Sequence, residues 1–175
     1  MQLNQNFKLP SLYLRVAIGS AYLWEVADRL GILGANGKPH VGWGDWKHFI
    51  TYASQVMSFL PASLIPAFAT LATLGEAIFG FLILIGLFTR MAAIGSSVLA
   101  FCFAIAMALS FGIESPLGYS VFTLSAASLL LATLPAYSWS IDSLLSNRKI
   151  NKHLNIYQDQ NSIKNKLPFL PAKTN

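Results

Sequence analysis

The sequence predicts an all-α integral membrane protein, a bundle of four transmembrane helices with an interfacial helix in its first outer loop. Of its 175 residues, 54% are hydrophobic and 11% are charged, whereas a soluble domain carries about 25% charged residues. Four apolar runs are present, and most are near the ~20 residues that cross a hydrocarbon core as a helix. A soluble chain of this size has no way to bury so much apolar surface. The lipid bilayer is therefore the first partner that we expect.

The apolar runs are separated by short segments that contain turn-forming residues, among them Gly, Pro and Asn. A helix needs about 20 residues to span a hydrocarbon core of ~30 Å, so each span should be about that long. We expect the spans at residues 12–33, 66–88, 91–113 and 117–134. Pro135 then ends or kinks the last helix, because proline lacks the N–H that a helix interior needs.

Basic residues are concentrated beyond the last apolar run. We expect an N-terminal segment (1–11), a transmembrane domain (12–145) and a basic, partly disordered tail (146–175). Placing both termini in the cytoplasm puts nine of the twelve basic residues on that side, as the positive-inside rule favours. We therefore expect a multi-pass protein of the cytoplasmic (inner) membrane and no nucleic-acid partner. Arg15 and Arg90, near the inner ends of their spans, are expected to extend to water.

The first outer loop, about residues 35–65, is too polar to cross a membrane. Its aromatic side chains are interleaved with His, Asp and Lys, a mixture that prefers the lipid–water boundary. Asp45 is placed to cap a short helix in which Trp46, Phe49 and Ala53 share one face. We expect this interfacial helix to lie across the outer end of the bundle.

Glu76 is the single charged residue in the second span. It lies about twelve residues, or roughly 18 Å, from the cytoplasmic end of that helix. A carboxylate at this depth costs at least ~2.5 kcal/mol unless it is protonated, paired or hydrated. Two interpretations follow. Glu76 is either a structural group that locks two helices together or a group that handles protons or binds a ligand.

Three further charged residues lie near the outer end of the first span: Glu25, Asp28 and Arg29. Glu25 and Arg29 are four residues apart, the spacing at which side chains meet on one face of a helix. This spacing leaves Asp28 for another partner. Either these residues emerge among the lipid headgroups, or they form with Glu76 a polar pocket that the aromatic outer loop covers.

Several chemistries are disfavoured by the residues present. Cys102 is the only cysteine, so an intramolecular disulfide and a CxxC redox centre are excluded. His40 and His48 lie in the outer loop, and no histidine pair lies within the spans to hold a haem. We expect Asp45 and these two histidines to form a solvated loop, and we expect no metal site. The first apolar run continues into charged residues without a cleavage site, so we interpret it as a retained helix.

The second and third spans carry the most distinctive pattern, GEAIFG at 75–80 and LIGLFTRMAA at 84–93. Arg15 and Gly19 in the first span add to it, as do the stretches ADRLG and GWGD in and after that span. Over residues 14–134 the sequence resembles the DoxX-like family of small membrane proteins. The resemblance implies a four-helix bundle in the cytoplasmic membrane, association with thiosulfate:quinone oxidoreductase, and hence quinone-linked sulfur chemistry.

The leading functional hypothesis is a small membrane subunit that binds a quinone-like ligand or supports a partner redox enzyme. Glu76 is the catalytic candidate, as a proton donor, while an arginine stabilises the developing anion. The candidate ligand-binding residues are Glu25, Asp28, Arg29, Trp43 and Trp46. No built-in cofactor is expected, and a quinone, a redox subunit or a second copy of the chain are the expected partners. The rival hypothesis is a non-enzymatic assembly or scaffolding subunit whose buried charges only fix helix packing.

Overall fold

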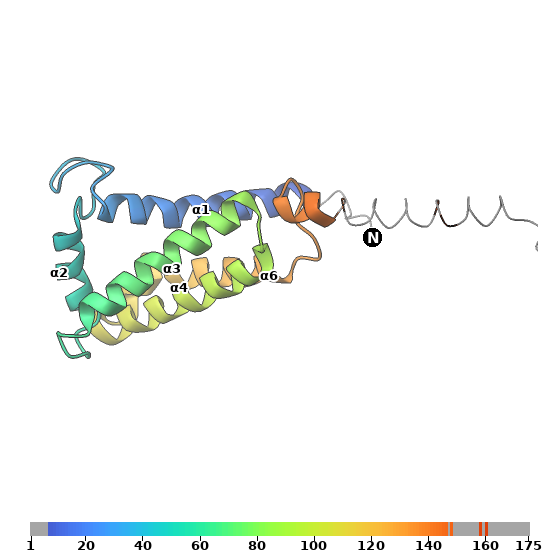
Figure 1. The fold of residues 1–175 in the computed structure, drawn as a ribbon. Helices are drawn as coiled ribbons and strands as arrows, with labels where there is room; N and C mark the ends of the chain where they lie inside the picture. Colours follow the sequence, from blue (N-terminus) through green and yellow to red (C-terminus); the bar gives the residue numbers. More distant parts are fainter. Residues whose placement is uncertain (1–6, 147, 149–157, 159, 161–175) are drawn as a thin grey trace, which may run out of the picture.

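The computed structural model describes residues 7–146 together with residues 148, 158 and 160, and the secondary structure in this part of the chain is helical throughout (Figure 1). The helices are α1 (Lys8–Arg29), α2 (Trp46–Val56), α3 (Ile65–Ile85), α4 (Thr89–Phe111), α5 (Glu114–Gly118) and α6 (Val121–Thr133). The predicted all-α fold is confirmed. The predicted basic tail (146–175) lies outside the described residues, apart from Ser146 and the three isolated positions.

Four helices run side by side, and the short α2 lies across one end of them (Figure 1). α1 packs against α3, α3 against α4, and α4 against α6, while a smaller contact between α1 and α6 completes the circuit. α3 and α4 are long and apolar enough to cross a membrane, with mean hydropathies of 2.0 and 2.2. These two helices point to a membrane protein.

The fourth apolar run differs from the prediction. A single helix was expected over 117–134, but the structure has the five-residue α5 and the thirteen-residue α6. Ser120 between them has φ of 57°, in the left-handed region that a continuing helix does not enter. Gly118 just before it is a poor helix former, which favours a break here. At ~1.5 Å per residue, α6 alone is about 20 Å long.

α2 forms where the outer-loop pattern predicts a capped, amphipathic helix. Asp45 is the N-cap, and its Oδ1 accepts the backbone N–H of His48 at 2.9 Å. Phe49 and Ala53 are buried in a core cluster with Ile65 and a neighbouring alanine of α3. The predicted helix across the bundle is confirmed, and its place at a membrane boundary stays a prediction.

α1 and α3 approach closely at two glycines. A Cβ on Gly19 would lie 2.9 Å from the carbonyl oxygen of Gly80, and a Cβ on Gly80 would lie 2.9 Å from the Cβ of Tyr22. Side chains larger than hydrogen would therefore push the helices apart, as in the small-residue contacts of membrane helices. This crossing sets which residues of α1 face which residues of α3.

The end of the bundle opposite α2 is held by a buried arginine. Arg15 is 1% exposed and donates to the carbonyl oxygens of Ile83 and Leu84 at 3.0 Å each, and of Ser138 and Trp139 at 2.9 and 3.2 Å. The prediction that Arg15 extends to water is wrong. The carbonyls at the C-terminus of α3 lack partners within their helix, and the guanidinium supplies them.

Hydroxyl groups link α1, α4 and α6 in the interior of the bundle. The Tyr22 hydroxyl donates to the carbonyl oxygen of Ser96 at 3.0 Å, and the hydroxyls of Ser96 and Ser128 lie 2.8 Å apart. Ser125 donates to the carbonyl oxygen of Ser97 at 2.8 Å. Small hydroxyl side chains allow helices to approach and bond across an apolar interior.

Candidate functional site

A buried ion pair joins α1 and α3. Arg29, in the last turn of α1, and Glu76, in the middle of α3, are 4% and 3% exposed. The guanidinium engages both carboxylate oxygens: Nη1 donates to Oε2, and Nη2 donates to Oε1 at 3.2 Å. Nη1 also donates to the Thr73 hydroxyl at 3.0 Å. A bidentate arginine–carboxylate pair is the geometry that best compensates two buried charges.

The periodicity of α3 explains why these groups meet. Thr73, Glu76, Gly80 and Ile83 are all buried and follow each other at spacings of three or four, which places them on one face of the helix. That face packs against α1, and the glycine in it brings the two helices close. Arg29 then lies opposite the carboxylate, although 47 residues separate the two in sequence.

Aromatic rings from α2 and the loop before it cover the guanidinium. The Arg29 Cζ lies 4.1 Å from the ring centroid of Phe49 and 5.1 Å from that of Trp43. These two rings meet edge to face, with centroids 5.2 Å apart. Because aromatic faces attract cations, the rings stabilise the arginine while they exclude water from it. The predicted aromatic cover over a polar cluster is therefore present.

Asp28 fixes the chain that carries this cover. It is 3% exposed, and its Oδ2 accepts the N–H groups of Gly42 and Trp43 at 3.0 and 2.9 Å while its Oδ1 accepts that of Gly44 at 3.1 Å. Three donors on one carboxylate anchor the loop to the end of α1. Asp28 thus faces another partner, as expected, and the partner is backbone of its own chain.

Two predicted site residues are placed differently from the rest. The Glu25–Arg29 pair that the spacing suggested does not form, because Glu76 occupies the guanidinium, and Glu25 is left partly buried beside it. Trp46 packs on Phe49 with ring centroids 5.3 Å apart, on the core cluster of α2. Arg29, Glu76, Asp28 and Trp43 therefore form the centre of the site, and Glu25 and Trp46 lie at its margins.

Phe49, Thr73 and Tyr52 belong to the site although the sequence analysis did not assign them to it. Thr73 lies three residues before Glu76, a spacing that would have pointed to it. The ring of Tyr52 lies 5.6 Å from that of Trp43 and 6.3 Å from that of Phe111. Burial raises the pKa of the Tyr52 phenol; nearby Tyr119 and Glu25 act in the same direction, and Arg29 opposes them.

One polar atom in the cluster lacks a partner. The Nε of Arg29 is buried and has no hydrogen-bond partner among the described residues. A buried donor without an acceptor costs about 1–3 kcal/mol or more, so an oxygen acceptor from a ligand or a water would stabilise this position. Within the described part of the chain, no group of three His, Cys, Asp or Glu residues is arranged to hold a metal ion.

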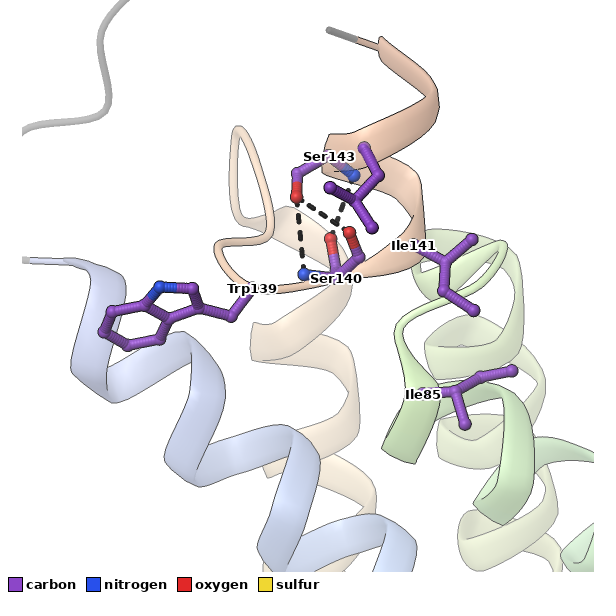
Figure 2. A pocket seen from close by; sticks show the side chains of 6 residues that line it. Ile85, Trp139, Ser140, Ile141 and Ser143 are labelled. Carbon is purple, nitrogen blue, oxygen red and sulfur yellow. Dashed lines mark hydrogen bonds between the residues drawn. The ribbon is translucent and has the colours of Figure 1, made fainter. Parts of the chain in front are cut away.

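A cleft of about 490 Å³ lies at the other end of the bundle. It is lined by Ile85 at the end of α3 and by five residues after α6: Trp139, Ser140, Ile141, Ser143 and Leu144. Figure 2 shows Ser140 and Ser143 bonded to each other beside it. The Ser140 hydroxyl donates to the carbonyl oxygen of Tyr137, and the Ser143 hydroxyl to that of Ser140. These hydroxyls are engaged within their own turn, whereas the buried ion pair of Arg29 and Glu76 lies toward the α2 end of the bundle.

Fold and site together define a small helical membrane protein with charges enclosed between its helices and apolar side chains on its surface. A family model described as TQO small subunit DoxD matches residues 11–168. The chain therefore belongs to this family, and the DoxX-like resemblance is confirmed. No curated protein and no solved structure matches the chain.

Proposed function

We propose that this protein is a small membrane subunit of a quinone-linked oxidoreductase and that a quinone headgroup binds beside Arg29. The family supports the first part, since its members are described as small subunits of a thiosulfate:quinone oxidoreductase. The second part rests on one observation: a buried arginine, placed against two aromatic rings, has an Nε without an acceptor. A quinone offers both a carbonyl oxygen for this donor and a flat ring for the aromatic side chains.

The proposal includes four membrane spans: α1, α3, α4 and the segment formed by α5 and α6. In support, the charges of α1 point inward: Arg15, Asp28 and Arg29 are all buried. Large apolar side chains occupy the outer surfaces of the helices, as lipid requires; they include Val16, Leu71, Phe81, Val98 and Leu129. Both termini lie in the cytoplasm in this arrangement, which follows the distribution of basic residues.

Arg29 would stabilise the negative charge that develops on a quinone oxygen as electrons arrive from a redox centre of the partner subunit. Glu76 holds the guanidinium in place through two hydrogen bonds. Trp43, already against the arginine, would stack on the ring. The role of Glu76 as proton donor stays a prediction. The Glu76→Gln variant tests whether Glu76 is needed to hold Arg29 in place for the ligand.

The test is the retention of quinone by protein purified in mild detergent, measured by mass spectrometry for wild type, Glu76→Gln and Glu114→Gln. Glu114 is an exposed carboxylate of α5, which makes it a matched control. We expect wild type and Glu114→Gln to retain quinone and Glu76→Gln to lose it, because the neutral amide leaves Arg29 misplaced and uncompensated. Thermal unfolding of each variant, monitored in parallel, shows whether a loss comes from the site or from the fold.

An assembly or scaffolding role is the second candidate. The observation that favours it is the closed geometry of the cluster, in which both oxygens of Glu76 are taken up by Arg29. In this case Glu76→Gln lowers thermal stability or recovery of the complex and changes no bound ligand. A wild-type protein that carries a stoichiometric protein partner and no quinone would decide for the scaffold and against the quinone site.

A further inference from the structure

Three carboxylates lie around Arg29, those of Glu25, Asp28 and Glu76, and two of them are fully engaged. Glu76 is bonded through both oxygens to Arg29. Asp28 is bonded through both oxygens to three backbone N–H groups. The third, Glu25, takes part in no hydrogen bond or ion pair within the described residues. It is the one carboxyl of the three that can gain or lose a proton without breaking a contact of the fold.

Glu25 is also directed toward the inside of the bundle. It shares a face of α1 with Ile18, Tyr22 and Arg29, which are all buried and follow at spacings of three or four. Unlike them it is only partly buried, so its carboxyl is not sealed within the bundle. A group that exchanges protons with an enclosed ligand needs both an inward position and a carboxyl that is not sealed off.

Charged and titratable groups surround Glu25 on several helices. Those within electrostatic range of it are Asp28 and Arg29 of α1, Tyr52 of α2 and Glu76 of α3. Tyr119, at the break between α5 and α6, lies within the same range of Tyr52. The Nε of Arg29, one helical turn from Glu25, has no acceptor among the described residues.

We propose that Glu25 is the proton-exchanging carboxyl of a ligand site centred on the Arg29 Nε, in place of Glu76. This inference rests on the proposed function, because it assigns the proton donor for a quinone bound there. When the partner's redox centre delivers electrons to the quinone, the O–H bond of the Glu25 acid breaks and an O–H bond forms on the reduced quinone oxygen. Glu25 is left as a carboxylate and regains a proton from water.

The experiment uses dicyclohexylcarbodiimide, an apolar reagent that couples to protonated carboxyls in apolar surroundings. The full-length protein in mild detergent or in membranes is treated over a pH series, and the modified residue is identified by peptide mass spectrometry. We expect adduct at Glu25, declining as pH rises, with none at Asp28 or at the solvent-exposed Glu114. Glu25→Gln should abolish the adduct, while Glu76→Gln should leave it in place.

A short-chain benzoquinone added before the reagent separates this inference from the proposed function. Adduct at Glu25 that the benzoquinone prevents supports both. Adduct at Glu25 that it does not prevent supports the proton-exchanging role and counts against a quinone at this site. Adduct at Glu76, or at no carboxyl of this end, overturns the assignment of Glu25 whether or not the purified protein retains quinone.

Discussion

Arg15 and Arg29 lie near opposite ends of α1 and use the same side chain in different ways. Arg15 has carbonyl oxygens as partners, four of them, from two segments that are far apart in sequence. Arg29 has a carboxylate and two aromatic rings. A guanidinium serves both sites because its planar fork presents several donors in fixed directions, which an ammonium group does not.

Replacing Arg15 by lysine should therefore destabilise the fold. A lysine offers three donors from one nitrogen to four carbonyls on two segments, so at least one carbonyl loses its donor. Each hydrogen bond to a charged group contributes about 1.5–3 kcal/mol, and we expect a loss of at least ~2 kcal/mol in unfolding free energy. Arg90→Lys is the matched control, because the exposed Arg90 donates to one carbonyl, that of Ala132. Denaturation in mild detergent measures the unfolding free energy of both variants. Equal losses would show that the four carbonyl contacts of Arg15 contribute no extra stability.

At the scale of the helices, α2 closes the site and its own stability depends on a cap. Asp45 accepts the His48 backbone N–H and also contacts the His48 ring, with Nδ1 2.8 Å from Oδ2. The backbone hydrogen bond from His48, followed by the contact with its ring, lowers the pKa of the Asp45 carboxyl. Since the rings over Arg29 are placed by α2 and its loop, the cap acts on the site through this helix.

Asp45→Ala should loosen α2, whereas Asp45→Asn should preserve it, because asparagine caps helices as well as aspartate does. The lowered pKa fixes the sign of the pH dependence. The stabilisation by Asp45 is present at neutral pH and is lost as pH falls through that lowered pKa. Tryptophan fluorescence from Trp43 and Trp46 should report this acid transition in wild type and lose it in Asp45→Asn. A transition unchanged by that substitution would assign it to another group.

The crossing of α1 and α3 gives a second prediction at this scale. Gly19→Ala and Gly80→Ala each place a methyl 2.9 Å from atoms of the facing helix, so the helices must separate. Overpacking of this kind costs about 1–3 kcal/mol, and it should also weaken the pair between Arg29 and Glu76. Gly118→Ala is the control, since nothing lies within 4 Å of its added Cβ. Thermal unfolding in detergent distinguishes the three, and a stable Gly80→Ala protein would show that the crossing is adaptable.

At the scale of the whole molecule, polar groups gather inside and apolar groups outside. Buried positions include Arg15, Asp28, Arg29, Glu76 and several serines, while the exposed surface carries many Leu, Ile, Val and Phe side chains. A protein in water has the opposite arrangement. In a bilayer this distribution is favourable, because internal pairing satisfies most of the polar groups that lipid leaves without a partner.

The proposed orientation is tested with single cysteines in a Cys102→Ser background. Lys38→Cys marks the outer loop, and Ser146→Cys marks the segment after α6; both positions are exposed. We expect a membrane-impermeant maleimide to label the first in intact cells and the second only after the membrane is opened, as the positive-inside rule favours. Labelling in the reverse order would invert the topology. Labelling of both positions in intact cells would rule out the three spans that we propose between them.

Sequence patterns predicted the elements whose causes are local. The Asp45 cap and the buried face of α2 follow from residues within one helix, and α3 and α4 follow from long, largely apolar runs. The break at Ser120 was missed, because an apolar run carries no periodicity that reveals a left-handed residue within it. Membership in the family was also evident from the sequence, and the match over residues 11–168 bears it out.

Partner choice is what the tertiary structure decided. The sequence predicted that Glu25, Asp28, Arg29 and Glu76 lie at membrane depth or near it, and the spacing within α1 suggested that Arg29 pairs with Glu25. In the fold Arg29 pairs with Glu76, 47 residues away. The physical reason is that the glycine contact between α1 and α3 brings the two charges together away from water, where a bidentate pair outweighs a contact within one helix.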